Sequence, residues 1–337
     1  MAEPRAALDL GSGTIKLSVF DRGPRGWAPL SLVEANTELR KGLGPELTLK
    51  PRPIRDTLAV AAEFQIQARA LGVTRLPAYA TSAVRKAANP GALLGPLKAM
   101  AIEARVLTEE EEGRWNLLGA LARLDPEFSG ARLAFEGGLG KTPPPQSRLS
   151  LNGTRILVCD PGGDSTECAA DVEGLGWEQA VVASLPFGSV SLQEHHGSSD
   201  DNGPLAWKRL EAAAAEAKAA AEAHPQFKAL AAAGLTPAIR VNAPIQRALE
   251  QVNGLPLREH GQGGAYGRPQ LETLCRATAA LDHQGRARLL AGEPLGKVDR
   301  TCYGFASWLG LLDAFHADRF LVEPWGIKLG AVIALNP

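Results

Sequence analysis

Two stretches of the sequence decide the expected fold: residues 6–20 read AALDLGSGTIKLSVF, and residues 155–172 read RILVCDPGGDSTECAADV. In each stretch a short apolar run ends at an aspartate, Asp9 or Asp160. A glycine-rich turn then leads into a second run with the pattern of a strand. We interpret both stretches as β-hairpins whose turns have room for a phosphate group. Two hairpins of the same design form a weak internal repeat.

The segments between and after the hairpins predict both helices and strands. Residues 109–124 begin with four glutamates, where the helix macrodipole favours acidic side chains, and continue with an apolar stripe. Helical patterns are also found in residues 54–71, 205–223 and 298–315, and short strands are expected at residues 76–80 and 319–322. The predicted class is therefore α/β, with helices and strands mixed along the chain.

The length of the chain predicts two domains. A single domain commonly has about 100–200 residues, and this chain has 337. We expect residues 1–124 to form the first domain and residues 153–337 the second, with a ligand cleft between them. Residues 125–152 are rich in glycine, proline and serine, which indicates an exposed insertion or linker.

The composition narrows the classes of function. The formal net charge is −1, so the chain lacks the overall positive charge of a general nucleic-acid binder. It has no apolar run near the roughly 20 residues that span a bilayer and no evident signal segment. A cytoplasmic protein without membrane contact is therefore expected. The four cysteines lie in apolar runs without metal-ligand spacing, which predicts buried, reduced thiols.

The turns and their aspartates indicate phosphate and metal chemistry. Glycine-rich turns present backbone N–H groups unhindered by side chains, and such groups bind phosphate oxygens. If the two hairpins are related by pseudo-symmetry, Asp9 and Asp160 face each other across the cleft. Carboxylate oxygens in that position hold Mg²⁺ together with waters and phosphate. A glycine–serine turn after a strand is often only a turn, so either hairpin alone is weak support.

Six short segments within the first 190 residues carry a further signal. They read AALDLGSGT at residues 6–14, GLG at 42–44, ATSAVRKAAN at 80–89, VLTEEEEGR at 106–114, DPGGDSTE at 160–167 and SLPFGSV at 184–190. In order and approximate spacing they resemble the motifs of the exopolyphosphatase and guanosine pentaphosphate phosphohydrolase (Ppx/GppA) family, in its short form. The resemblance implies the two-domain, ribonuclease-H-like fold of the actin-like ATPases, with the ligand bound in the cleft.

The resemblance also implies a phosphoric anhydride hydrolase that releases the terminal phosphate of inorganic polyphosphate or guanosine pentaphosphate. The family's general base falls on Glu112, at a helix start where a carboxylate can orient and deprotonate water. The family's metal-binding carboxylates fall on Asp160 and Glu167, with Asp9 nearby, and the implied cofactor is Mg²⁺ or Mn²⁺. The residues expected to contact phosphate are Arg85, Gly11, Ser12, Gly13, Thr14, Gly162, Gly163, Ser165 and Thr166.

The sequence departs from the family's motifs at several positions. Gly13 and Thr14 replace an asparagine and a serine in the first turn, and Asp164 replaces a glycine in the second. A carboxylate inside a phosphate cradle repels the ligand unless a metal lies between them. Residues 239–243 lack the family's third glycine motif, and residues 326–330, GIKLG, lack its arginine and glutamate.

Two other functions are kept as alternatives. With hydrolysis lost through Asp164 and the missing third motif, the same fold would be a sensor that binds polyphosphate or a phosphorylated nucleotide. An actin-like ATPase or sugar kinase is disfavoured because no adenosine-side glycine motif is visible. The sequence does not choose between polyphosphate and guanosine pentaphosphate, and it leaves the oligomeric state open, a homodimer included.

Two further motifs resemble functional sites, but we assign neither of them a function. Residues 138–142, GLGKT, resemble part of a P-loop, but Phe135 stands where the earlier glycine is required and prolines follow. His195 and His196 have no carboxylate or cysteine neighbour at ligand spacing in the sequence. They are therefore expected to be solvated surface histidines and not metal ligands.

Overall fold

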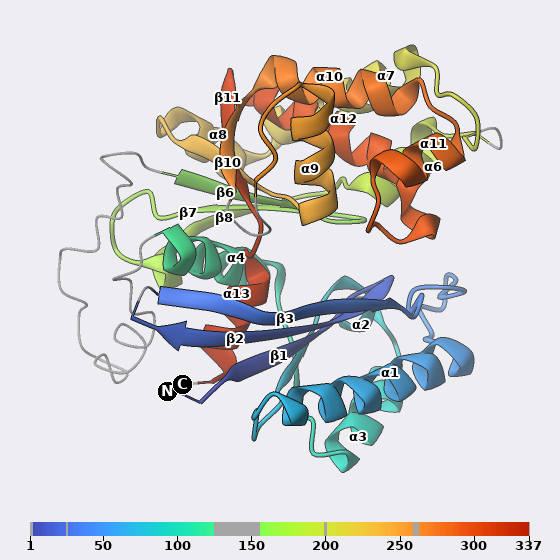
Figure 1. The fold of residues 1–337 in the computed structure, drawn as a ribbon, viewed down its shortest axis with the longest axis vertical. Helices are drawn as coiled ribbons and strands as arrows, with labels where there is room; N and C mark the ends of the chain where they lie inside the picture. Colours follow the sequence, from blue (N-terminus) through green and yellow to red (C-terminus); the bar gives the residue numbers. More distant parts are fainter. Residues whose placement is uncertain (1–2, 25, 125–155, 199–200, 259–262, 337) are drawn as a thin grey trace. The chain divides into compact units, whose positions relative to one another are not determined.

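The chain folds into two compact units, each with its own sheet. The computed structural model describes residues 3–24, 26–124, 156–198, 201–258 and 263–336 (Figure 1). The first unit contains Met1–Pro145 and Ile327–Pro337, and the second contains Gln146–Gly326. The expected linker at residues 125–152, with its segment 138–142, lies outside the described residues.

A five-stranded mixed sheet forms the centre of the first unit, in the order β3-β2-β1-β4-β5. Its strands are β1 (Arg5–Leu10), β2 (Thr14–Gly23), β3 (Gly26–Asn36), β4 (Ala78–Ala80) and β5 (Ala104–Val106). The first three are antiparallel neighbours, and β1, β4 and β5 run parallel. The first expected hairpin forms because the apolar side chains of β1 and β2, such as Leu8 and Leu17, are buried in one core.

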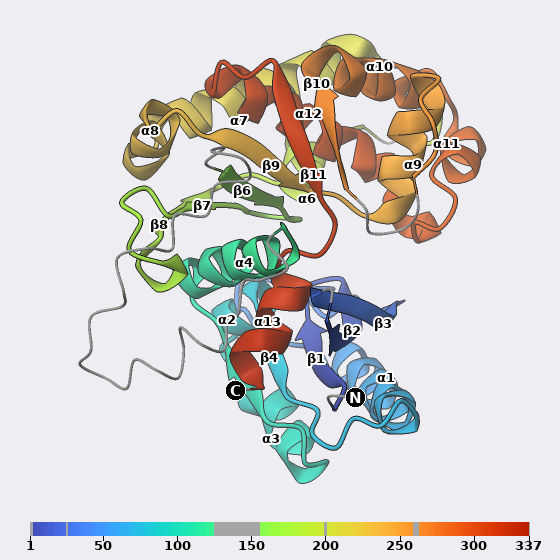
Figure 2. The same cartoon turned by 60° about the vertical axis from the view of Figure 1, so that its left-hand side comes forward.

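Helices pack on both faces of this sheet, as Figure 1 and Figure 2 show. They are α1 (Pro51–Ala70), α2 (Ser82–Lys86), α3 (Gly91–Ala99), α4 (Glu109–Leu124) and α13 (Ile327–Leu335). The first helix starts at Pro51, whose fixed φ suits the first helical position, and it buries Ile54 and Phe64 in the core of this unit.

The C-terminal helix α13 belongs to the first unit, whereas the sequence placed residues 153–337 together in the second domain. α13 packs against α4, β1 and β2. Its side chains are almost all apolar and buried, so the helix is stable only where it covers a core. The backbone N–H of Ile327 donates a 2.7 Å hydrogen bond to Oδ1 of Asn116 on α4, and this buried bond fixes the start of α13.

A six-stranded mixed sheet forms the centre of the second unit, in the order β10-β11-β9-β6-β7-β8. Its strands are β6 (Ile156–Pro161), β7 (Thr166–Ala170), β8 (Val181–Leu185), β9 (Thr236–Arg240), β10 (Gly264–Gly267) and β11 (Arg319–Glu323). β6, β7 and β8 are antiparallel neighbours, β6, β9 and β11 run parallel, and β10 is antiparallel to β11.

The helices of the second unit share one large apolar core with one face of its sheet. They are α6 (Ser189–His196), α7 (Trp207–Ala223), α8 (Pro225–Ala232), α9 (Ala243–Val252), α10 (Arg268–Ala279), α11 (His283–Leu289) and α12 (Val298–Ala314), with short 3-10 turns at Trp177–Gln179 and Leu295–Lys297. The alanine-rich α7 lies against α12. A Cβ atom at Gly310 of α12 would overlap the carbonyl oxygen of Ala214, so small residues permit this close approach.

The two sheets share one plan. The order β3-β2-β1-β4-β5 in the first unit corresponds to β8-β7-β6-β9-β11 in the second, and in both cases three antiparallel strands are followed by two parallel ones. The internal repeat inferred from the two hairpins is therefore confirmed, and so is the α/β class of the fold.

The remaining general expectations concern the thiols and the membrane. All four cysteines are buried and free, as predicted. Cys159 and Cys168 are direct cross-strand partners, with their sulfur atoms 3.5 Å apart. Within the described ranges, no helix combines the length and the apolar character needed to cross a membrane.

Candidate active site

The first hairpin turn joins β1 to β2 and requires a glycine at its start. The N–H of Gly11 donates a 3.0 Å hydrogen bond to the carbonyl oxygen of Thr14 and so closes the turn. A Cβ atom on Gly11 would lie 2.9 Å from that oxygen, closer than a carbon atom can approach without displacing the backbone. The glycine is therefore required by the turn itself, before any ligand is considered.

The segment after β3 holds this turn by its carbonyl groups. The carbonyl oxygen of Gly13 accepts hydrogen bonds from the N–H groups of Thr37 and Glu38, and that of Ser12 accepts one from Arg40. These bonds are 2.8–3.1 Å long. The turn is thus held in the first unit by backbone hydrogen bonds.

The second turn, between β6 and β7, repeats this geometry. The N–H of Gly162 donates a 2.9 Å hydrogen bond to the carbonyl oxygen of Ser165, and a Cβ atom on Gly162 would lie 2.9 Å from the same oxygen. The carbonyl oxygens of Gly162 and Gly163 accept hydrogen bonds from the N–H groups of Ser189 and Val190, at 3.0 and 2.8 Å. The two turns therefore match in their closing bond and in the way they are held.

The motif SLPFGSV brings the start of α6 onto the second turn. A Cβ atom on Gly188 would lie 2.5 Å from the carbonyl carbon of Gly163, so only glycine permits this approach. The hydroxyl group of Thr166 donates a 2.8 Å hydrogen bond to the carbonyl oxygen of Phe187, and Thr166 is fully buried. The sequence predicts that this hydroxyl group contacts phosphate. In the structure it links β7 to the SLPFGSV motif.

Each hairpin carries its aspartate beside a basic side chain. The carboxylate of Asp9 accepts a 3.0 Å hydrogen bond from Nζ of Lys16, its cross-strand partner on β2. The carboxylate of Asp160 is ion-paired with Nε of Arg240, the last residue of β9. Both aspartates are 6% exposed. The sequence interpretation had assigned neither Lys16 nor Arg240 a role.

Glu167 lies next to Asp160 on the neighbouring strand. The two residues are direct cross-strand partners, and their side chains therefore project from the same face of the sheet. Oε1 of Glu167 accepts hydrogen bonds from the hydroxyl groups of Ser165, at 2.7 Å, and Ser184, at 3.4 Å. Glu167 is 2% exposed, so its charge is held inside the second unit by hydroxyl donors.

This arrangement does not fit the divalent metal implied by the resemblance. Two neighbouring carboxylates are suitable ligands for Mg²⁺, but Asp160 directs its carboxylate to a guanidinium group. Across the described parts of the chain, no three histidine, cysteine, aspartate or glutamate side chains are grouped as a metal site needs. A metal at Asp160 would compete with Arg240 for the carboxylate and would place a second cation beside the guanidinium group.

In the first unit, Glu112 is held by Arg85. The guanidinium group of Arg85, on α2, donates to Oε2 of Glu112 at 3.2 Å and to Oε1 of Glu109 at 3.3 Å. It also donates a 2.9 Å hydrogen bond to the carbonyl oxygen of Leu107. Arg85, expected to contact phosphate, therefore fixes the orientation of the carboxylate expected to act as the base.

The four glutamates at the start of α4 have different partners. Glu111 forms a capping box with Thr108: the N–H of Thr108 donates to Oε2 of Glu111 at 3.0 Å, and the N–H of Glu111 donates to Oγ1 of Thr108 at 3.1 Å. Glu110 pairs with Arg114 one turn along the helix. The remaining two, Glu109 and Glu112, form ion pairs with Arg85. In this they differ from the glutamates of an ordinary helix start, which are hydrated.

The predicted site residues divide between the two units. The first contains Asp9, Gly11, Ser12, Gly13, Thr14, Arg85 and Glu112, and the second contains Asp160, Gly162, Gly163, Ser165, Thr166 and Glu167. Inside each unit the structure assembles the expected neighbours, such as Asp160 with Glu167. The convergence of Glu112 with Asp160 and Glu167 on one phosphate remains a prediction.

His195 and His196 have a carboxylate neighbour that the local sequence did not reveal. Nδ1 of His195 and Nε2 of His196 lie 2.8 and 2.7 Å from the two carboxylate oxygens of Glu216 on α7. Burial raises the pKa of Glu216, but the hydrogen bonds and charges of the two imidazoles outweigh it and lower that pKa overall. The contacts of His195 and His196 with Glu216 thus join α6 to α7, although His195 itself is largely exposed.

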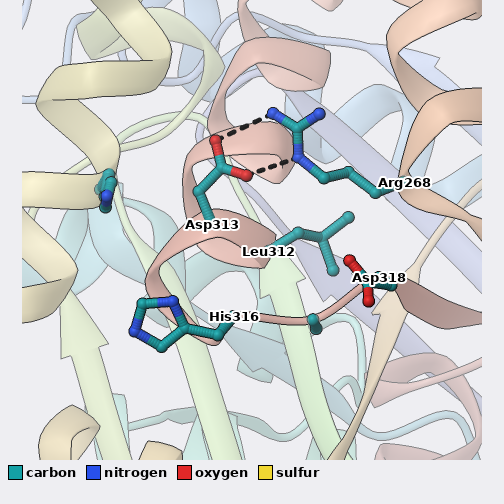
Figure 3. A pocket seen from close by; sticks show the side chains of 7 residues that line it. Arg268, Leu312, Asp313, His316 and Asp318 are labelled. Atoms are coloured by element: carbon teal, nitrogen blue, oxygen red, sulfur yellow. Dashed lines mark hydrogen bonds and ion pairs between the residues drawn. The ribbon is translucent and has the colours of Figure 1, made fainter.

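A surface pocket in the second unit lies outside the predicted site. It has a volume of about 350 Å³ and is lined by Lys218, Arg268, Leu312, Asp313, His316, Ala317 and Asp318. Figure 3 shows that Arg268 and Asp313 face each other there through two hydrogen bonds. Since none of the predicted site residues lines this pocket and its arginine is engaged by Asp313, we assign it no role in phosphate chemistry.

Comparisons with known proteins find similarity to exopolyphosphatases over part of the chain. No family model matches the chain. Exopolyphosphatase 1 of Mycobacterium tuberculosis is 28% identical over 187 residues, which is 55% of this chain and 46% of that protein. Exopolyphosphatase 1 of Mycobacterium leprae is also 28% identical over 187 residues, 55% of this chain and 47% of that protein. The matched part therefore spans about half the length of these relatives.

Solved structures match nearly the whole chain. A Ppx/GppA family member of Aquifex aeolicus has a TM-score of 0.72 at 19% identity, covering 99% of this chain and 97% of that one. An exopolyphosphatase from Cytophaga hutchinsonii has a TM-score of 0.76 at 15% identity, with coverage of 99% and 97%. The chain thus has two mixed sheets and shares the α/β fold of these Ppx/GppA and exopolyphosphatase structures. Over about half of its length the chain is also similar in sequence to the exopolyphosphatases 1 of these mycobacteria.

Proposed function

We propose that this protein is a phosphoric anhydride hydrolase that releases the terminal phosphate of inorganic polyphosphate or guanosine pentaphosphate by attack of water. The observation that carries the proposal is the repeated turn. Two hairpins, at equivalent places in two sheets, have the same closing hydrogen bond and the same need for glycine. Turns of this kind bind phosphate oxygens through their N–H groups.

Glu112 is the proposed general base. Its N–H donates to the carbonyl oxygen of Thr108, so the residue lies in the first turn of α4. Arg85 holds its carboxylate in one orientation, and an oriented carboxylate can position a water molecule and accept its proton. Because Arg85 is itself a fork of N–H donors, it can also contact a phosphate oxygen close to that water.

The substrate class rests on the relatives. Proteins that share 28% identity with this chain are named exopolyphosphatases, so inorganic polyphosphate is the first substrate to test, with guanosine pentaphosphate beside it. The protein's own residues would bind the phosphate at the two turns and take up the proton at Glu112.

The proposal is tested by the variant Glu112→Gln. It keeps the size of the side chain but removes the base, and general-base catalysis contributes about 10²–10⁴-fold. Phosphate release from polyphosphate, measured with malachite green, should fall by about that factor while polyphosphate binding is retained. The matched control is Glu110→Gln, which is the same change on the same helical turn. The side chain of Glu110 pairs with Arg114, one turn further along the helix. Equal loss in both variants would remove Glu112 from the mechanism.

The second candidate function is a sensor that binds the same ligands without turnover. It is favoured by one observation, the carboxylate of Asp164 within the second turn. The wild-type protein would then bind polyphosphate but release no phosphate, and Asp164→Gly would restore release. Release by the wild-type protein at a rate that Asp164→Gly does not raise would exclude the sensor.

A further inference from the structure

A basic residue occupies the end of a strand beside the second turn. β9 runs parallel to β6, with Ile239 opposite Cys159, so the next residue, Arg240, lies beside Asp160. Nε of Arg240 is ion-paired with Oδ1 of Asp160. The side chains are 15% and 9% exposed, so the pair is mostly withdrawn from water. The contact joins residues 80 positions apart and depends wholly on the pairing of the two strands.

The surrounding charges explain why a cation is needed there. Asp160 and Glu167 are buried carboxylates that face the same side of neighbouring strands, and Asp164 adds a third carboxylate in the turn between them. Like charges on neighbouring strands repel each other strongly when they are shielded from water. A phosphate group approaching the turn would meet the same repulsion. Either a divalent ion or a fixed basic side chain must offset it.

We infer that Arg240 is the resident cation of the second turn and binds the substrate phosphate there in the place of a protein-bound divalent ion. This inference rests on the proposed phosphate chemistry of the turn. A guanidinium group is a planar fork of N–H donors whose geometry suits phosphate as well as carboxylate. Arg240 also lies in residues 239–243, where the sequence lacks the expected third glycine motif.

The consequence is a different dependence on metal ions. Asp160 is already neutralised by Arg240, so a divalent ion gains little from Asp160 and Glu167 and is repelled by the guanidinium. The wild-type protein should therefore bind a short polyphosphate without a divalent ion. Removing the positive charge of Arg240 should convert the same two carboxylates into a metal site.

The first test measures metal binding alone, with Mn²⁺ as the probe and electron paramagnetic resonance as the readout. Wild-type protein should show no Mn²⁺ binding that depends on Asp160. Arg240→Gln should gain one Mn²⁺ site, and the double variant Arg240→Gln with Asp160→Asn should lose it again. Arg240→Lys, which keeps the charge, should behave as the wild type. A wild-type Mn²⁺ site that disappears in Asp160→Asn would overturn the inference, whether or not the Arg240 variants fold.

The second test measures tripolyphosphate binding by calorimetry, in EDTA and in Mg²⁺. Wild-type protein should bind in EDTA, and Arg240→Gln should bind there about 10- to 100-fold more weakly, as expected for a lost charged hydrogen bond. Binding by the wild type only in Mg²⁺ would overturn the inference and leave the proposed function standing. Absence of binding in both conditions would refute the proposed function, and the Mn²⁺ titration would still decide whether Arg240 replaces the metal.

Discussion

Replacing Gly330 by alanine should destabilise the first unit because α13 and α4 touch at that residue. A Cβ atom there would overlap the carbonyl oxygen of Trp115 and lie 2.7 Å from its carbonyl carbon. Carbon atoms pack at about 3.5–4.0 Å, so α13 must shift by roughly 1 Å. Such a shift strains the 2.7 Å hydrogen bond between Ile327 and Asn116.

The expected change in the free energy of unfolding of Gly330→Ala has three contributions. Overpacking of this kind costs about 1–3 kcal/mol, and loss of a buried hydrogen bond costs about 1–3 kcal/mol. The better helix propensity of alanine offsets about 1 kcal/mol. The free energy of unfolding of the first unit should therefore fall by about 3 kcal/mol.

Urea unfolding followed by tryptophan fluorescence measures this change, because Trp115 lies on α4 at the contact and is buried. The matched control is Gly91→Ala, also a helical glycine, in α3, where a Cβ atom meets nothing within 4 Å and no proline follows. That variant should be stabilised by about 1 kcal/mol. Gly310→Ala, which brings a Cβ atom 2.9 Å from that of Ala217, should destabilise the second unit instead. If Gly330→Ala is as stable as Gly91→Ala, the packing argument for α13 is refuted.

Two further predictions concern the turns and pH. Alanine at Gly11 and alanine at Gly162 should cost similar amounts, about 1–3 kcal/mol in thermal unfolding experiments, because both new Cβ atoms lie 2.9 Å from the closing carbonyl oxygen; a clear cost at only one of the two would contradict the repeat. Burial raises the pKa of Cys302 from 9.0 to about 11, so stability that is present below pH 9 is lost between pH 9 and 11, by about 3 kcal/mol. Urea midpoints across this range should fall more steeply for wild type than for Cys302→Ala, and parallel curves would show that this thiol does not contribute.

The two arginines at the candidate site have related roles in the two units. Arg85 fixes the carboxylate of Glu112, and Arg240 neutralises that of Asp160. In both units a buried or partly buried carboxylate is thus supplied with its counter-charge by the protein itself. Removing one partner of such a pair leaves an uncompensated charge, which costs more than the pair contributes. Variants at either arginine therefore need a stability measurement beside the functional one.

Several elements could be predicted closely from local sequence. α4 occupies residues 109–124 as expected, since its acidic first turn and apolar stripe are both short-range signals. The expected helix at residues 298–315 is observed as α12 (Val298–Ala314). The two hairpins were predictable for the same reason, because an apolar run, an aspartate and a glycine-rich turn are adjacent in the chain.

Other elements gave no clear local signal. β9 is only five residues long and contains Pro237, which is unusual in a central strand. Because this strand was not predicted, Arg240 could not be placed beside Asp160. The helix α13 was not predicted either, and the structure places it in the first unit.

By itself, the sequence determined the α/β class, the repeated hairpin, the helix that begins with four glutamates and the set of phosphate-binding candidates. Only the tertiary structure decided which charges meet: Arg85 with Glu112, Lys16 with Asp9, and Arg240 with Asp160. The physical reason is the range of the interactions. Turns and helix starts depend on residues a few positions apart, whereas the partner of Asp160 is set by the pairing of parallel strands across 80 positions of the chain.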